Sequence, residues 1–446
     1  MTPAGFGWAK IARLGLVQTA LGAIVVLMTS TINRVMVVEL AFPALVPGLL
    51  VAVHYGVQTL RPAWGYGSDV GGRRTPWIVG GMAALAFGAV GAALGTALAG
   101  TSRPLGIALA ALSFLVVGVG VGAAGTSVLA MLATRVTPGR RAAAASTVWM
   151  MMIFGFALSA PLAGHFLDPF SNERLIAVTA AVCLTAFLVC VLAVWGVEDD
   201  DVASSARRLA PRTKPGLANA LREQWSEPAA RRFAIFIFVS TLAYSAQELL
   251  VEPFAGLVFG MTPGVTTKLA GLQHGGVLTG MIGVAIAAST IGRPILGSLR
   301  LWTTAGCVAS ALSLLGIAAG GLLSATPGVF VTAVFALGIS NGAFAAAAIG
   351  SMMSLAGAGA ASREGTRMGI WGAAQAVAFG LGGVAATLLV DVARFLLASA
   401  PIAYSLAFAA DATLFLFAAA LARTTAQSFS SAHASPALTR SEAISA

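Results

Sequence analysis

Four charged residues lie in stretches that are otherwise apolar, where they could form ion pairs or exchange a proton. Arg34 and Glu39 lie near the end of one stretch, and Glu248 and Glu252 near the end of another. Glu248 and Glu252 are four residues apart, so on a helix they share one face, where two carboxylates repel unless one holds a proton or both share a cation. A charge in apolar surroundings is costly unless it is paired or lines a cavity, so Arg34 is their expected partner.

The apolar stretches themselves are long enough to cross a membrane. Of 446 residues, 58% are hydrophobic and 9% are charged, which is too little charge to cover a soluble surface of this size. Because about 20 mostly apolar residues make a transmembrane helix, we predict an all-α membrane protein with 12 transmembrane helices. The predicted spans are residues 14–38, 44–63, 76–98, 105–134, 142–166, 174–196, 232–259, 274–292, 302–323, 328–355, 369–390 and 401–422.

Lys and Arg residues are divided unevenly by these spans. Of 26 cationic residues, five fall on one side of the membrane and the rest on the other. The five are Arg34, Arg103, Arg174, Lys268 and Arg394. Because cationic residues are retained on the cytoplasmic face, both termini are predicted to be cytoplasmic. The net charge of +10 is then an orientation signal with affinity for anionic membrane lipid, and we predict no nucleic-acid partner.

Two six-span bundles are predicted from the change of composition near the middle of the chain. The units are residues 1–197 for the N-terminal bundle, 198–231 for a charged cytoplasmic linker, 232–423 for the C-terminal bundle, and 424–446 for a disordered cytoplasmic tail.

Similar polar marks recur in the two bundles. A slide of 213 residues lays Arg34 on Gln247 and Glu39 on Glu252, and matching spans end near Asp168 and Asp391. The order of these marks favours a duplication, giving two six-helix pseudo-repeats. This is the architecture of the major facilitator superfamily.

The loop between the second and third spans resembles the signature loop of that superfamily. It carries Gly65, Asp69, Gly72, Arg73 and Arg74. The glycines allow a tight turn, Asp69 can accept hydrogen bonds from a helix N-terminus, and the arginines can bind carboxylates or helix C-terminal carbonyls. We expect a conformational latch here. A basic loop that only sets topology would explain the arginines but not the spacing of Asp and Gly.

The intramembrane charges are predicted to meet at one end of the bundle. Arg34 lies about 31 Å along its helix, and Glu248 and Glu252 lie about 24 and 30 Å along theirs, at about 1.5 Å per residue. We therefore expect an ion-pair cluster of these residues, with Glu39, joining the two halves near the outer face. Its role is either a static plug or proton coupling, and the shallow depth favours the plug.

Pigment ligation is a further chemistry that the intramembrane residues could support. His54 lies near the middle of the second span and His274 at the outer edge of the eighth. A neutral imidazole can ligate the magnesium of a chlorin, and carboxylates such as Glu39 or Glu252 can do so less commonly. A hydrogen-bonded histidine in a helix bundle is the more common case. No nucleophile, metal cluster or phosphate loop is apparent, so an enzyme is not predicted.

Longer runs of sequence resemble the PucC family, also called the bacteriochlorophyll delivery family. The runs are Arg13–Thr19, Thr29–Leu40, His54–Gln58 with Arg61 and Pro62, Gly67–Ile78 and Glu248–Gly260. The resemblance covers nearly the whole chain up to about residue 423. It implies a protein of the inner, intracytoplasmic membrane of purple phototrophic bacteria that assembles light-harvesting complexes. It also implies bacteriochlorophyll as bound cargo, with antenna polypeptides and bacteriochlorophyll synthase as partners.

Within the family, the short loop Ser68–Gly72 lacks the insertion of core-antenna members and places the chain nearer to the peripheral-antenna or pigment-cluster members. A different class of function stays open beside this one. The single latch and the intramembrane carboxylates are also typical of a proton-coupled, alternating-access transporter of a small solute. Few charges lie at the membrane midplane, which disfavours a strongly polar solute.

Overall fold

The computed structural model describes residues 6–61, 64, 73–198, 228–287, 298–323, 326–357 and 364–434. All the elements in this described part are helical. Eleven of its helices are long and apolar enough to cross a membrane, and the second predicted span corresponds to a shorter apolar helix, Leu45–Leu60. The chain is therefore an all-α, multi-pass membrane protein.

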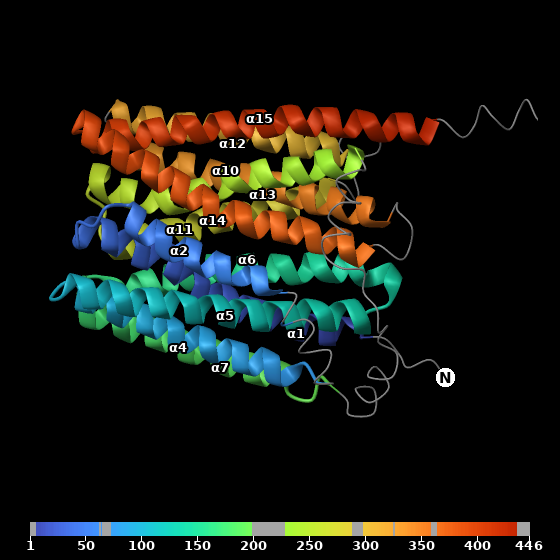
Figure 1. Ribbon diagram of the computed structural model, residues 1–446, viewed down its shortest axis with the longest axis horizontal. Helices are drawn as coiled ribbons and strands as arrows, with labels where there is room; N and C mark the ends of the chain where they lie inside the picture. Colours follow the sequence, from blue (N-terminus) through green and yellow to red (C-terminus); the bar gives the residue numbers. More distant parts are fainter. Residues whose placement is uncertain are drawn as a thin grey trace, which may run out of the picture.

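The helices fall into two groups (Figure 1). The first group, coloured blue to green, contains α1 (Trp8–Val26), η1 (Leu27–Ile32), η2 (Val35–Glu39), α2 (Leu45–Val57), η3 (Gln58–Leu60), α4 (Thr75–Ala99), α5 (Arg103–Arg135), η4 (Pro138–Arg140), α6 (Arg141–Leu167) and α7 (Asn172–Val194). The second group, coloured yellow-green to red, contains α10 (Pro228–Phe259), α11 (Pro263–Ile286), α12 (Leu299–Leu322), α13 (Pro327–Gly357), α14 (Glu364–Leu397) and α15 (Ala400–Ala434).

Each group has its own apolar core. One core is built almost wholly from residues of the first group and the other almost wholly from the second. The groups meet along a seam where α6 packs against α11, α2 against α14, and η1 and η2 against α10. We call the end of the bundle that holds Glu39 the distal end, and the end that holds Trp8 the amino-terminal end.

The eighth predicted span starts too late. The helix begins at Pro263 and not near residue 274, because Thr262 caps it by accepting a hydrogen bond from the Val265 amide, and Pro263 fits the first turn of a helix. His274 consequently lies eleven residues into α11, roughly 16 Å from its start. It is thus near the middle of the helix and not at its edge.

Two helix ends at the distal end share one backbone pattern. Ala41 and Gly260 both have positive φ, 50° and 65°. In each case the next residue, Phe42 or Met261, donates its amide hydrogen to the carbonyl six residues back, one residue further than the corresponding bond of a Schellman cap. The positions are 219 residues apart, so the slide of 213 residues predicted from Arg34 and Glu39 does not align these helix ends.

The first transmembrane helix is wide over its distal part. η1 and η2 are π-helical, with Asn33 and Arg34 between them. Extra residues per turn of this kind are frequent where a helix carries functional side chains, because they redirect side chains and free carbonyls. At the other end of the chain, α15 continues to Ala434, beyond the span predicted to end at residue 422. Residues 199–227, which make up most of the predicted linker, lie outside the described residues.

Candidate functional site at the seam

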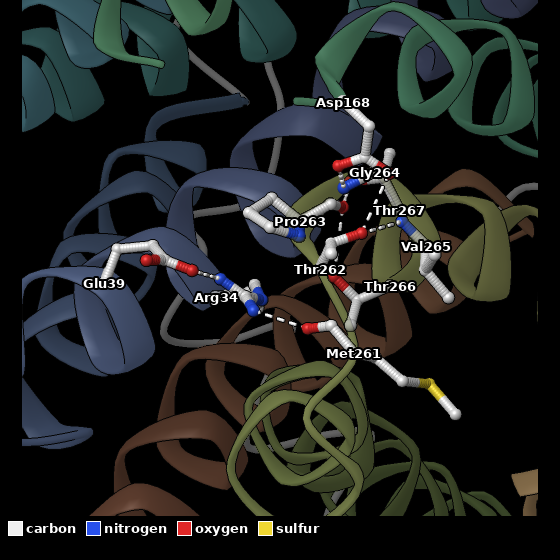
Figure 2. Close-up of polar contacts among 10 residues, drawn as sticks. All are labelled: Arg34, Glu39, Asp168, Met261, Thr262, Pro263, Gly264, Val265, Thr266 and Thr267. Carbon is white, nitrogen blue, oxygen red and sulfur yellow. Dashed lines mark hydrogen bonds and ion pairs between the residues drawn. The ribbon is translucent and has the colours of Figure 1, made fainter. Parts of the chain in front are cut away.

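Arg34 is the centre of the distal seam. Its side chain is 3% exposed, and it forms an ion pair with Glu39, which is 36% exposed. Its Nη2 donates a hydrogen bond to the carbonyl of Met261 in the second group, at 2.6 Å (Figure 2). A Cβ atom on Gly256 would lie 3.1 Å from Arg34 Nη2, closer than an ordinary contact, so the glycine leaves room for Arg34 against α10. One cation therefore joins both groups.

Asp168, just after α6, binds the start of α11 across the seam. Its carboxylate accepts hydrogen bonds from the Thr262 hydroxyl at 2.8 Å and from the Gly264 amide at 3.2 Å (Figure 2). The amides of a first helical turn have no partners within the helix, and the helix dipole favours an anion there. Gly264 also permits the contact, because any side chain would overlap Asp168.

Asp391 makes the reciprocal contact from the second group to the first. Its two carboxylate oxygens accept hydrogen bonds from the amides of Ala44 and Leu45, at 2.9 and 2.8 Å, at the start of α2. Gly48 then lies against Thr387 of α14. Each group thus supplies one aspartate that caps a helix of the other, and both contacts lie at the distal end.

Asn33 repairs a defect in the hydrogen bonding of α10. Pro253 lies inside α10 and has no amide hydrogen, so the carbonyl of Leu249 loses its helical partner. The side-chain amide of Asn33 donates to that carbonyl at 2.9 Å. Nearby, the hydroxyls of Thr31 and Thr267 are 3.0 Å apart across the seam. These contacts continue the polar seam toward the middle of the helices.

Glu252 lies beside Arg34 without forming the ion pair, and Glu248 lies apart from both. The ion pair of Arg34 is with Glu39, whereas Glu252 is buried and faces Ser30 and Arg34. Glu39 is the better partner because its carboxylate keeps access to water at the helix end, which lowers the cost of removing the pair from solvent. Of the four residues in the predicted cluster, Arg34 and Glu39 form the ion pair, and Glu252 lies beside them.

Glu248 instead faces His274 near the middle of the seam. One carboxylate oxygen lies 3.9 Å from His274 Nε2, which is too long for a hydrogen bond, and the Glu248 side chain is 16% exposed. His274 Nδ1 donates to the Ala270 carbonyl at 2.8 Å. In a neutral imidazole this leaves Nε2 with a lone pair directed into the seam.

Aromatic side chains of both groups surround this pair. Tyr55 of α2 stacks on Phe379 of α14 with ring centroids 4.9 Å apart, and Tyr244 of α10 meets the same Phe379 edge-on at 6.0 Å. Phe156 of α6 contacts the His274 ring at 4.7 Å. The middle of the seam is thus lined by rings with a carboxylate and an imidazole between them.

His54, the other histidine ligand candidate, has its Nε2 engaged by a neighbouring side chain, while Nδ1 is buried without a hydrogen-bond partner. Its Nε2 lies 2.8 Å from the Gln58 amide nitrogen, and Gln58 in turn accepts from Arg61. Because an amide nitrogen can only donate, His54 Nε2 is the acceptor, so Nδ1 carries the hydrogen of the neutral ring. His54 has no lone pair left for a metal in this arrangement.

The predicted latch falls mostly outside the described residues, which include Arg73 and Arg74 but not Gly65, Asp69 and Gly72. Beside it, Glu198 caps the start of α4. Its carboxylate accepts hydrogen bonds from the amides of Arg74 and Thr75 at 2.9–3.0 Å, and from the Thr75 hydroxyl. The sequence places Glu198 in the charged linker, and because it is more than 120 residues from the start of α4, no local pattern indicates this contact.

Asp411 is a second residue that sequence reasoning missed. It is 2% exposed and lies near the middle of the span Ala400–Arg423. The signal was plain, because a single acid in the middle of an apolar span is rare and costly.

Taken together, the described fold is that of an α-helical, multi-pass membrane protein with a polar seam between two helix groups. The family model described as "PUCC protein" matches residues 31–428. The chain therefore belongs to the PucC family, as its resemblance implied.

Several curated proteins are similar over most of their length. "Bacteriochlorophyll synthase 44.5 kDa chain" of Rhodobacter capsulatus is 52% identical over 420 residues, covering 93% of this chain and 95% of that protein. "Protein PucC" of Cereibacter sphaeroides is 30% identical, covering 86% and 83%. An "uncharacterized protein in puhA-bchM intergenic region" of Rhodobacter capsulatus is 31% identical, covering 83% and 78%.

Proposed function

We propose that this protein is an integral membrane assembly factor for bacterial light-harvesting complexes that binds bacteriochlorophyll and delivers it to antenna polypeptides. The observation that carries this proposal is membership of the PucC family across residues 31–428. The name of the relative that shares 52% identity also refers to bacteriochlorophyll. The protein then lies in the inner, intracytoplasmic membrane with both termini in the cytoplasm, and bacteriochlorophyll synthase is a partner that supplies pigment.

Among the candidate pigment ligands, the contacts favour His274. A metal-ligating histidine usually donates its second ring N–H to a carbonyl or carboxylate, which orients the ring, and His274 Nδ1 donates to Ala270 O. His54 Nε2 is engaged by Gln58, and Glu39 is paired with Arg34. Glu252 is buried against Ser30 and Arg34. Magnesium of the chlorin needs one axial donor, and His274 Nε2 offers it in a seam lined by aromatic rings.

Purification from a pigment-making host tests this proposal. We expect bacteriochlorophyll absorbance to co-elute with the detergent-solubilised protein and to fall several-fold in His274→Ala. His54→Ala is the matched control with a buried histidine, and His165→Ala, which alters an exposed one, controls for surface binding. A pigment-free preparation, together with an unaffected antenna in a deletion strain, would count against the function. Normal loading of His274→Ala would count only against the ligand.

A proton-coupled, alternating-access transporter is the second candidate. The reciprocal aspartate caps favour it, since they close one end of the seam through a few hydrogen bonds that a rocking motion could break. Under this function, Glu252→Gln would abolish uptake of a solute in cells without pigment synthesis. Unchanged uptake in that variant would exclude proton coupling at Glu252.

A further inference from the structure

The interior of the second helix group contains an aromatic layer near the distal end. The ring of Phe254 on α10 touches three rings from two other helices, with centroids 5.2–5.7 Å away: Phe330 of α13, and Tyr404 and Phe408 of α15. All four side chains are buried. These contacts fix which faces of α10, α13 and α15 point at one another.

A second aromatic layer lies closer to the amino-terminal end. Phe344 of α13 contacts Phe236 of α10 and Phe415 of α15, each at 6.2 Å between centroids. On each helix the residues of the two layers are separated by whole numbers of turns, so they lie on the same face. The three helices therefore face one common interior from one layer to the other.

Three polar residues lie on these same faces between the layers. Asp411 is three residues after Phe408 and four before Phe415 on α15. Gln247 is seven residues before Phe254 on α10, and Asn341 is three residues before Phe344 on α13. Residues three, four or seven apart lie on the same face of a helix, so each polar residue lies on the helix face that carries the aromatic residues. The topology thus brings a carboxyl group and two carboxamides into one apolar interior.

These side chains are buried, and all but one of their polar atoms lack hydrogen bonds among the described residues. Gln247 and Asn341 are 0% exposed and Asp411 is 2% exposed. Both carboxyl oxygens of Asp411, both polar atoms of the Gln247 amide and the Asn341 amide nitrogen have no hydrogen-bond partner. The Asn341 amide oxygen accepts from Ser310 at 2.8 Å. Unpaired buried polar atoms are rare, so a set of five in one interior indicates a common function.

Asp411 also lacks a positive partner. Arg34 is the one Lys or Arg that is fully buried among the described residues, and it is bound to Glu39 at the seam. The described cations on the helices packed against α15, and on α15 itself, lie at the ends of the membrane-spanning stretches, whereas Asp411 lies in the middle of one. The described ionisable side chains of these helices are Arg231, Arg232, Tyr244, Glu248 and Glu252 of α10, Arg300 and Cys307 of α12, Asp391 and Arg394 of α14, and Tyr404 and Arg423 of α15.

We propose that Asp411, with the Gln247 and Asn341 amides, forms a proton-binding site inside the second helix group. An isolated carboxylate is too costly in an apolar interior, so Asp411 binds a proton and is held as the neutral acid. The acid O–H can donate to the Gln247 amide oxygen, directly or through one water molecule, and its carbonyl oxygen can accept from an amide N–H. The proposal does not depend on pigment binding.

Infrared spectroscopy of the purified full-length protein tests the proposal directly. We expect the carbonyl stretching band of a protonated carboxylic acid at neutral pH, shifting in D₂O and absent from Asp411→Asn. Glu252→Gln, which removes another buried carboxyl group, should keep this band. Asp411→Asn should also unfold at the temperature of the unchanged protein, because a neutral acid and an amide differ little in desolvation cost.

Two results would overturn the site. One is a spectrum of Asp411→Asn that superimposes on that of the unchanged protein. The other is a melting temperature that rises with sodium chloride but not with choline chloride, and does so only when Asp411 is present, since this would make the ligand a metal cation. If Asp411→Asn fails to fold, Gln247→Leu serves instead. It should shift the frequency of the acid band, and an unshifted band would exclude the proposed hydrogen bonding.

Discussion

At the residue scale, the contact of Asn33 with α10 follows from one proline. Pro253 removes the amide that would bind Leu249 O, and Asn33 supplies another donor from the opposite group. Membrane-spanning backbone needs such a replacement because lipid offers none. The hydrogen bond that α10 lacks within its own group is thus replaced by one from the other group.

This origin of the contact predicts a non-additive pair of variants. Asn33→Ala should destabilise the protein by about 1–3 kcal/mol, because the Leu249 carbonyl is left buried and unpaired. In a Pro253→Ala background the amide of residue 253 can bind that carbonyl, so the same change should cost much less. Thermal unfolding of the four proteins in detergent measures the coupling. Equal costs in both backgrounds would show that Asn33 acts through something other than Leu249.

Backbone conformation at the distal helix ends supports a second prediction. Ala41 has φ of 50°, where a side chain costs about 1–2 kcal/mol and glycine costs little. Ala41→Gly should therefore stabilise the protein by roughly 0.5–1 kcal/mol after the extra entropy of glycine in the unfolded chain. Gly260→Ala should destabilise it. Ala44→Gly, at φ of −61°, is the control and should not stabilise.

The residue types in the seam could be predicted from the sequence, but their partners could not. The sequence predicts that Arg34 and Glu252 lie close together, and in the structure both are buried and the Arg34 charge acts on Glu252. The partner of Arg34 depends on the direction of its side chain, which is set by the π-helical turns and by the free carbonyl after the end of α10. Residue spacing in the sequence does not reveal either feature. Asp411 could be predicted as a functional candidate from the sequence, because it is a single acidic residue within an apolar span.

At the scale of elements, helix ends were the least predictable feature. Hydropathy locates apolar length, whereas Pro263 and Thr262 start α11 well before its most apolar part. As a result His274, the pigment ligand that we propose, lies near the middle of a helix and not at its edge. Capping residues indicate where a helix begins, whereas a hydropathy average over many residues does not.

The reciprocal aspartate caps predict how the distal end opens. Asp168→Asn and Asp391→Asn each weaken a charge-assisted contact worth roughly 1.5–3 kcal/mol. A single cysteine in place of buried Thr267 should then react several-fold faster with a thiol reagent, and faster still in the double variant. Glu173→Gln, which alters an exposed acid in the first turn of α7, is the control. An unchanged reaction rate in both aspartate variants would mean that the caps do not hold the seam.

At the scale of the whole molecule, the hydrogen bonds across the seam named here lie toward the distal end, while each group keeps its own core. The seam also holds a small apolar cluster of Ile153 from α6 with Val277 and Met281 from α11. Because each group keeps its own core, the two can still move apart without unfolding. We propose that they are the two six-helix pseudo-repeats of a major facilitator fold, with residues 1–197 and 232–423 as their bounds. The described residues contain eleven long apolar helices and one shorter one, a number that is compatible with six helices in each half.

Fastening the seam should stop any function that needs the groups to part. Cysteines in place of Thr31 and Thr267, whose hydroxyl oxygens are 3.0 Å apart, can be bridged by oxidation or by a short thiol cross-linker. Cys183, Cys190 and Cys307, which are free and buried, would first be replaced by alanine. We expect the bridged protein to lose pigment loading and to regain it on reduction. Normal loading of the bridged protein would favour a static distal plug.

The exchange of caps, in which Asp168 binds the start of α11 and Asp391 the start of α2, also bears on ancestry. Such a pattern is isologous: it is what a dimer of identical, half-length chains would show, with one acid from each copy reaching the same place on the other. Under such a gene fusion, each half would keep both the aspartate that caps a helix of the other half and the helix start that the other half's aspartate caps. If the two groups are pseudo-repeats, as we propose, the two acids derive from one ancestral residue. A homologue that had lost one of them should then have lost the constraint on the other.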